Sequence, residues 1–176
     1  MPAPTPVAEL LFRREDAVPI STDETTLKPW SQARACLESA PKAWLSTVRP
    51  DGRPHAMPIL VVWVDDAPCF ATRPGSRKGR NLARNTHCVI SAADENVDIV
   101  VEGDAIRVRD EAGLHRVAAA FKAKYQWEFT VRDGSAHEDA LPGSPEYGFF
   151  QIMPTRAFGY GPDGMTATRW RFDRPQ

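Results

Sequence analysis

The chain has 176 residues, of which 42% are hydrophobic and 26% charged, a composition that fits one globular domain with a real core. Its formal net charge of −1 argues against a general electrostatic attraction to nucleic acid or to an anionic membrane. There is no apolar run of membrane-spanning length and no signal-peptide pattern. Cys36, Cys69 and Cys88 are too few and too widely spaced for a disulfide framework or a structural zinc site. We therefore expect a reduced, cytoplasmic protein with no membrane span.

The chain begins with a segment rich in Pro, Thr and acidic residues, over 1–28, which predicts a mobile or loosely docked arm. We expect one domain to follow it, over 29–176. A helix is predicted over 28–40, because Trp30, Ala33, Cys36 and Leu37 fall on one helical face and Pro41 ends the pattern.

The pattern then changes to that of β-structure. Strands are predicted over 44–48, 54–64 and 68–73, the first two joined by the turn Pro50-Asp51-Gly52. The run from Ile59 to Val64 is continuously apolar. Such a run predicts burial on both faces, as in a barrel or at a dimer interface.

The remaining elements are a helix over 76–85, strands over 87–92 and 98–110, and a helix over 111–126. The polar segment 133–145 is predicted to be a lid or a disordered insert. Two last strands, over 148–160 and 165–172, form a hairpin. The whole pattern predicts a mainly β (α+β) fold, a six- to seven-stranded antiparallel barrel with flanking helices.

The most informative stretch runs from Phe70 to Leu82, where a strand meets a Pro-Gly break and then a helix whose first turn is Ser76-Arg77-Lys78. Free N–H groups and cationic side chains at such a point favour a phosphate group. Five cations fall within twelve positions: Arg73, Arg77, Lys78, Arg80 and Arg84. This local cluster on a near-neutral chain indicates a discrete anion, although Arg80 and Arg84 also fit a solvated helix face.

The other motifs in the sequence are weaker evidence for a function. The letters G-x-G-x-x-G occur over 159–164, but Pro162-Asp163-Gly164 reads as a hairpin turn where a dinucleotide site needs a helix. His137-Glu138-Asp139 is a solvated loop in this interpretation, and no metal site is predicted. His55, at the start of a strand, is interpreted as a structural residue. No pattern pairs a nucleophile with a base, so no catalytic residue is assigned.

Two segments resemble the pyridoxamine 5′-phosphate oxidase superfamily of flavin-binding split β-barrels: 43–55, and Phe70-Ala71-Thr72 followed by Ser76-Arg77-Lys78. The resemblance, over roughly 40–160, implies a homodimer with the cofactor at the subunit interface and a small-molecule substrate. It implies that Ser76, Arg77 and Lys78 hold the cofactor phosphate and that the strand backbone lies along the ring. The implied cofactor-binding residues are Met57, Pro58, Ile59, Leu60, Val61, Ala71, Thr72, Ser76, Arg77 and Lys78, extended along the helix by Arg80 and Asn81.

The sequence departs from true pyridoxamine phosphate oxidases at Ala56, where those enzymes carry a phosphate-gripping Arg, and over 150–156. The segment 78–85 is more similar to an actinobacterial branch that often uses the deazaflavin coenzyme F420, so the resemblance favours coenzyme F420 over FMN. It implies an oxidoreductase that exchanges a hydride with a small organic substrate. A non-catalytic cofactor carrier and an FMN-dependent pyridoxamine phosphate oxidase remain alternatives. A nucleic-acid binder is disfavoured by the net charge and by the lack of aromatics within 71–90.

Overall fold

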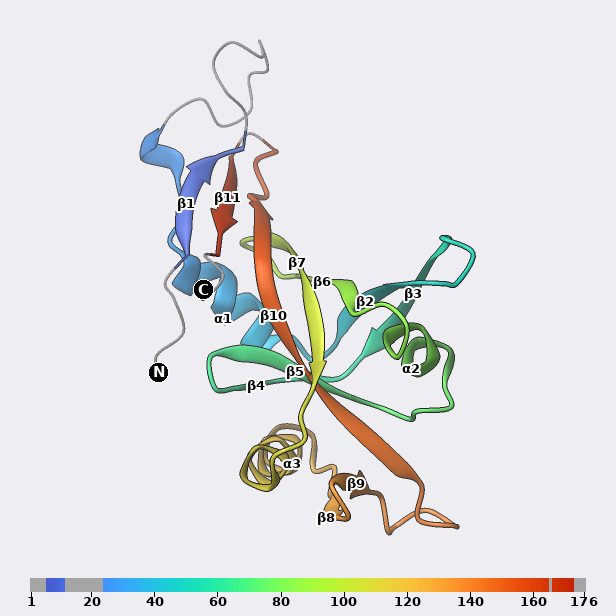
Figure 1. Ribbon diagram of the computed structural model, residues 1–176. Helices are drawn as coiled ribbons and strands as arrows, with labels where there is room; N and C mark the ends of the chain where they lie inside the picture. Colours follow the sequence, from blue (N-terminus) through green and yellow to red (C-terminus); the bar gives the residue numbers. More distant parts are fainter. Residues whose placement is uncertain (1–5, 12–23, 165, 173–176) are drawn as a thin grey trace.

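An antiparallel sheet that curls into an open barrel makes up most of the structure, a computed structural model that describes residues 6–11, 24–164 and 166–172 (Figure 1). The strands are β1 (Val7–Leu10), β2 (Ala43–Val48), β3 (Pro54–Ile59), β4 (Val61–Val64), β5 (Ala67–Thr72), β6 (His87–Ala93), β7 (Asp98–Arg107), β8 (Thr130–Arg132), β9 (Ser135–His137), β10 (Glu146–Tyr160) and β11 (Ala167–Arg171). The helices are η2 (Glu24–Thr26), α1 (Trp30–Ser39), α2 (Arg77–Leu82) and α3 (Glu111–Tyr125). This confirms the predicted antiparallel split-barrel class.

The long strand β10 organises the sheet. Along the path β1-β11-β10-β7-β6-β2-β3 it lies between β11 and β7, and its first half also pairs with β5 and β9. Phe70 of β5 and Phe150 of β10 pair in register and stack with ring centroids 5.4 Å apart. Strand β10 thereby joins the barrel to the β4–β5 hairpin, which crosses the end of the barrel (Figure 1).

The predicted single strand over 54–64 is wrong: the chain forms two strands that separate at Leu60. β3 pairs with β2, whereas β4 pairs with β5 through a two-residue turn at Asp65 and Asp66, both of which have positive φ. Val61 joins the core inside the barrel, and Val62 joins a second core beneath α3. Apart from Leu60, which is exposed, the apolar run is therefore buried or partly buried within one chain and needs no second subunit to explain it.

The segment 133–145 also differs from the prediction of a lid or disordered insert. β8 and β9 form a hairpin over 130–137, and β9 adds to the end of β10, where Ala136 pairs with Tyr147. The Ser135 hydroxyl donates to Glu146 at 2.7 Å, and Arg107 donates to both residues. Eleven strands result in the described residues, where six to seven were expected. The additions are β1, the division at Leu60 and this hairpin.

Helices α1 and α3 close the two cores. The buried residues of α1, Ala33, Cys36 and Leu37, cap the barrel interior as their spacing predicts, with Pro29 at the N-cap. Phe121 of α3 lies against Phe149 with ring centroids 5.7 Å apart in the second core. Helix α2 is shorter than the predicted 76–85 helix and starts at Arg77.

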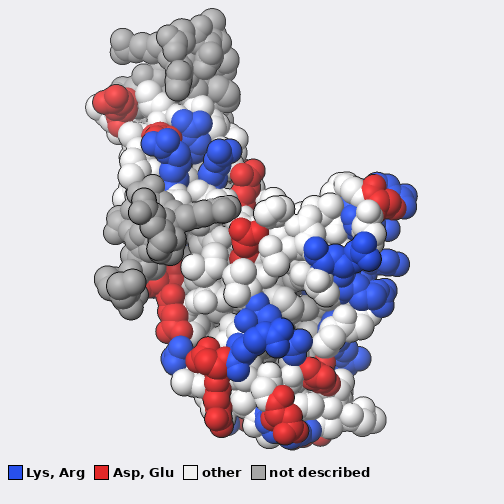
Figure 2. Space-filling model, viewed as in Figure 1, with Lys and Arg blue, Asp and Glu red and all other residues white. Residues whose placement is uncertain are grey.

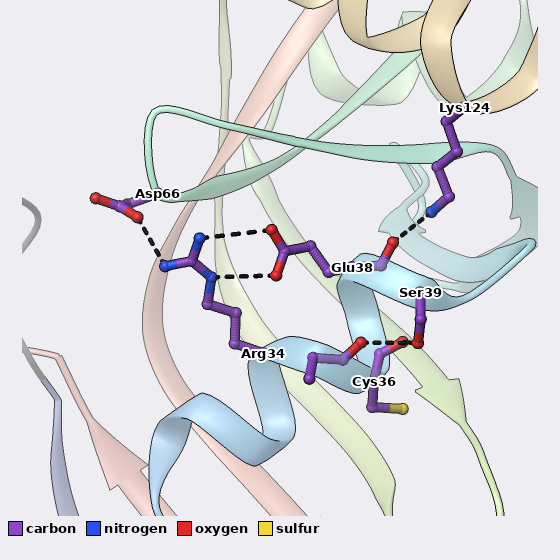
Figure 3. A network of polar contacts seen from close by, with 7 residues as sticks. Arg34, Cys36, Glu38, Ser39, Asp66 and Lys124 are labelled. Carbon is purple, nitrogen blue, oxygen red and sulfur yellow. Dashed lines mark hydrogen bonds and ion pairs between the residues drawn. The ribbon is translucent and has the colours of Figure 1, made fainter.

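A polar network ties α1 to α3 and to the β4–β5 turn (Figure 3). The Lys124 ammonium donates to the backbone carbonyls of Glu38, Ala40 and Val61 at 2.7, 2.8 and 2.9 Å. Arg34 lies between Glu38 and Asp66, with an Nη1–Oδ1 distance of 2.8 Å to Asp66. The network fixes the start of β4 directly after the break at Leu60.

The described part of the predicted arm is docked on the sheet. β1 pairs with β11, and Glu9 binds Arg169 at 3.0 Å and also binds Arg171. The Trp170 indole donates to the Lys28 carbonyl at 3.1 Å. Residues 1–5 and 12–23 of the arm lie outside the described part of the chain. None of the described helices is long and apolar enough to cross a membrane.

Candidate functional site

The site begins where β5 passes into α2. Ser76 is the N-cap of α2, and its hydroxyl accepts a hydrogen bond from the Gly79 amide at 3.1 Å. The same hydroxyl lies 2.9 Å from the Thr72 hydroxyl at the end of β5. Thr72 is buried, whereas Arg77 is exposed and Lys78 half-buried. The structure thus brings Ser76, Arg77 and Lys78, the three residues of the predicted phosphate site, next to Thr72, a predicted cofactor contact.

Gly79 lets this turn close tightly. A Cβ at residue 79 would lie 2.4 Å from the carbonyl oxygen of Arg73 and 2.8 Å from that of Pro74. The backbone of 73–74 therefore packs directly against the first turn of α2. The site is a compact backbone cradle that presents the two cationic side chains at its mouth.

The opposite wall comes from the β2–β3 hairpin. The Asn81 amide of α2 donates to the Thr47 hydroxyl at 2.9 Å, and both residues are buried. Thr47 pairs across the hairpin with His55. Asn81 was predicted to bind cofactor; the structure shows its side chain directed to β2, where it fastens α2 onto the sheet.

Two side chains on this wall carry buried nitrogen atoms with no hydrogen-bond partner among the described residues: Nε of Arg49 and Nδ1 of His55. Burial, and then the charges of Arg49, Arg77 and Lys78, lower the pKa of His55 below its usual value. Burial likewise lowers the pKa of the Lys78 ammonium. Arg49 was not predicted as a site residue, and His55 was interpreted as structural. The signal was available in the alternation Leu45, Thr47, Arg49, which places Arg49 on the face that α2 covers.

Cations dominate this part of the surface. Figure 2 shows Lys and Arg side chains gathered over α2 and the adjoining β2–β3 hairpin. Within the described residues, no carboxylate forms an ion pair with Arg49, Arg77 or Lys78. Asp51, at the hairpin tip, is held by Arg53 at 2.6 Å. Arg80 folds back and donates to the Gly75 carbonyl. The excess positive charge is left for a ligand from outside the chain.

The predicted ring-binding residues lie on β3, β4 and β5 next to this cradle. Met57, Pro58 and Leu60 are exposed at the edge of the sheet, Ala71 is partly exposed, and Ile59 and Val61 are buried. The Val61 amide donates a hydrogen bond to the Tyr125 hydroxyl at 3.2 Å. A ligand along this edge would therefore meet the side chains of Met57 and Leu60 and the backbone between them.

A cavity of about 410 Å³ lies along β2, β6 and β7 and shares Thr47 with the wall described above. Its lining includes Ser46, Val89 and the pair His87–Asp104, whose Nδ1–Oδ1 distance is 2.7 Å. None of the predicted cofactor residues lines it. The three cysteines supply no reactive thiolate to either place, because burial raises the pKa of Cys36, Cys69 and Cys88 to about 12.

The fold and the cradle define a split β-barrel protein with a cationic surface between α2 and the β2–β3 hairpin. The family model for pyridoxamine 5′-phosphate oxidase matches residues 30–160, and the chain belongs to this family. Among proteins with curated functions, none matches the sequence significantly.

Solved structures share the fold at low sequence identity. A heme binding protein from Mycobacterium smegmatis superposes with a TM-score of 0.63 at 17% identity, over 80% of this chain and 56% of its own. An FAD binding protein from the same organism gives 0.52 at 22%, over 81% and 96%. A structure described as an F420 reductase gives 0.53 at 21%, over 70% and 94%. At these identities the likeness shows the fold alone.

Proposed function

We propose that this protein binds a phosphorylated flavin or deazaflavin, with its phosphate at the cradle between α2 and the β2–β3 hairpin. The observation that carries the proposal is the group of cations Arg49, Arg77 and Lys78. Nε of Arg49 is buried without a hydrogen-bond partner, and the Lys78 ammonium is desolvated. No carboxylate forms an ion pair with any of the three within the described residues. A phosphate would supply both the missing charge and the missing acceptors. Membership of the pyridoxamine 5′-phosphate oxidase family supports this cofactor class.

The protein's own residues would bind and orient this group. Ser76, Arg77 and Lys78 would hold the phosphate, and the exposed edge at Met57, Pro58 and Leu60 would lie along the ring. When bound, a flavin or deazaflavin supplies two-electron redox chemistry, so we propose an oxidoreductase that acts on a small organic substrate. The exposed apolar side chains at this edge would exclude water from the face of the ring.

Coenzyme F420 is the cofactor we propose in preference to FMN. Its tail is longer and more highly charged than a single phosphate, and the cationic surface continues from Arg80 in α2 to Arg84, just beyond the end of the helix. Arg84 is exposed, so its charge is available to a distal part of a bound tail. Replacing Arg84 with Ala should therefore weaken F420 binding and leave FMN binding nearly unchanged, since exposed charges about 10 Å apart are largely screened.

We further propose a homodimer formed by the outer face of the sheet. Trp44, Ile106 and Met153 project from the same face of β2, β7 and β10, and their exposed fractions are 50%, 48% and 43%. Large apolar side chains grouped on one face of a sheet favour association with a second copy. The apolar run 59–64 gives no support to a dimer, because its pairing and burial are explained within a single chain.

The test is a titration of the purified protein with FMN, with riboflavin and with coenzyme F420, followed by absorption and fluorescence. The proposal predicts saturable binding of a phosphorylated cofactor and at least ten-fold weaker binding of riboflavin, because riboflavin lacks the phosphate. Equal affinity for FMN and riboflavin, with no F420 binding, would remove the phosphate site. Turnover of the bound cofactor by candidate reductants separates an oxidoreductase from a carrier, which binds and does not turn over.

A further inference from the structure

Two buried nitrogen atoms on the sheet side of the cradle lack a partner. Nε of Arg49 and Nδ1 of His55 are shielded from solvent, and neither makes a hydrogen bond within the described residues. Leaving a buried polar group unpaired costs about 1–3 kcal/mol, and more when the group is charged. A fold tolerates two such groups most readily where a bound ligand supplies their missing hydrogen-bond partners.

The two residues face α2. Arg49 follows Thr47 by two positions on the β2 segment, so the two side chains project from the same face, and His55 pairs with Thr47 across the hairpin. The hydrogen bond from Asn81 to Thr47 fixes α2 over that face. Lys78 lies three residues before Asn81, which is the spacing that puts two side chains on one side of a helix. Arg49, His55 and Lys78 therefore converge on one space.

The electrostatics of His55 agrees with this placement. The positive charges of Arg49, Arg77 and Lys78 act on the His55 ring and disfavour its protonation. On the sheet side, Asp51 is engaged by Arg53, and the thiol of Cys88, next to Thr47 on β6, is neutral. The three cations so arranged repel one another and disfavour protonation of the imidazole, and a bound anion would relieve both effects.

We propose that Arg49 and His55 are phosphate ligands that close the site from the sheet side, opposite Ser76, Arg77 and Lys78. The inference rests on the proposed cofactor function and adds two binding residues to it. The ligand chemistry is a phosphate monoester or diester whose oxygens accept from the Arg49 guanidinium and the His55 ring on one side and from Lys78 on the other. The site then encloses the phosphate, whereas α2 alone would leave it on an open surface.

The experiment compares FMN with riboflavin, and coenzyme F420 with its phosphate-free deazaflavin core, in Arg49→Gln, His55→Gln and Lys78→Ala. Each variant should weaken binding of the phosphorylated ligand at least ten-fold and change binding of the phosphate-free ligand less than two-fold, as for a lost charge-assisted hydrogen bond. The matched control is Arg53→Gln, which removes an exposed cation from the same hairpin and should change neither affinity more than two-fold.

The melting temperature of the ligand-free protein gives a second readout. Arg49→Gln should not lower it, because the substitution relieves repulsion among the cations. If Arg49→Gln and His55→Gln bind phosphorylated ligands as tightly as wild type while Lys78→Ala does not, this inference is overturned and the proposed function stands. Equal losses for both ligand types, with a lower melting temperature, assign the two residues a structural role and also overturn it. A wild type that does not discriminate between phosphorylated and phosphate-free ligands overturns the proposed function itself.

Discussion

Gly79 shows how one residue sets the shape of the candidate site. Its missing side chain lets the carbonyls of Arg73 and Pro74 approach to distances that no Cβ could occupy. Gly79→Ala should therefore push α2 away from the preceding turn and lower the free energy of unfolding by about 1–3 kcal/mol. Urea denaturation followed by circular dichroism measures this. Gly75→Ala is the control, because its Cβ would meet nothing within 4 Å; an equal loss at both positions would contradict the packing argument.

His55 should make the free energy of unfolding of the ligand-free protein depend on pH. Its pKa is lower in the folded protein than in the unfolded chain, first because it is buried and then because of the cations around it. The unfolded chain therefore binds more protons just below pH 6.5, so the free energy of unfolding of the ligand-free protein should fall as the pH falls from about 6.5 toward 5. His55→Gln should reduce this slope relative to wild type. A slope that is identical in the two proteins would show that His55 is not the group that titrates.

At the scale of elements, Lys124 holds three segments together. Its ammonium donates to carbonyls at the end of α1 and at the start of β4, as Figure 3 shows for Glu38. Lys124→Met keeps much of the aliphatic stem but leaves these carbonyls without their donor, so the free energy of unfolding should fall by about 2–3 kcal/mol. Thermal and urea denaturation check the value. Lys122→Met, which removes only an exposed ion pair with Glu128, should cost less than about 0.5 kcal/mol.

Contacts between elements also decide why the predicted strand is divided at Leu60. Periodicity over 54–64 gives no hint of it, because Ile59, Val61 and Val62 are all buried and the run looks continuous. The break exists because β3 must pair with β2 while β4 pairs with β5, on the other side of the barrel opening. Only pairing partners distant in the sequence distinguish one bent segment from one straight strand.

At the scale of the molecule, the proposed dimer predicts which exposed side chains matter. Trp44→Glu combined with Met153→Glu should convert a dimer to a monomer without unfolding it, because both side chains are largely exposed in the single chain. Sedimentation velocity at micromolar concentration measures the change. Leu141→Glu, at an exposed position on the loop after β9, is the control. A wild type that sediments as a monomer would refute the dimer.

Val62 is unsuitable as a probe of the dimer, because it is buried beneath α3 and a charge there would unfold the chain.

The sequence by itself determined the class of the fold and one half of the candidate site. Alternating apolar residues, the Asp-Gly turn and the Pro-Gly break are local signals, and they predicted the main strands, α1, α3 and the cluster Ser76-Arg77-Lys78. The same signals exposed the G-x-G-x-x-G match as a turn, which the β10–β11 hairpin confirms. The hairpin over 130–137 escaped prediction because its strands have three residues each and are stabilised by contacts with β10 and α3.

The tertiary structure alone decided the other half of the site. Arg49 and His55 stand apart from Lys78 by more than twenty positions along the chain, and no local signal within 43–55 marks either of them as a phosphate ligand. Their convergence depends on the β2–β3 register and on the hydrogen bond that fastens Asn81 to Thr47. Local sequence encodes the propensity of each segment, whereas the burial and charge of a side chain depend on which distant segment folds over it. That is why the residues of the α2 turn could be predicted and those of the opposite wall could not.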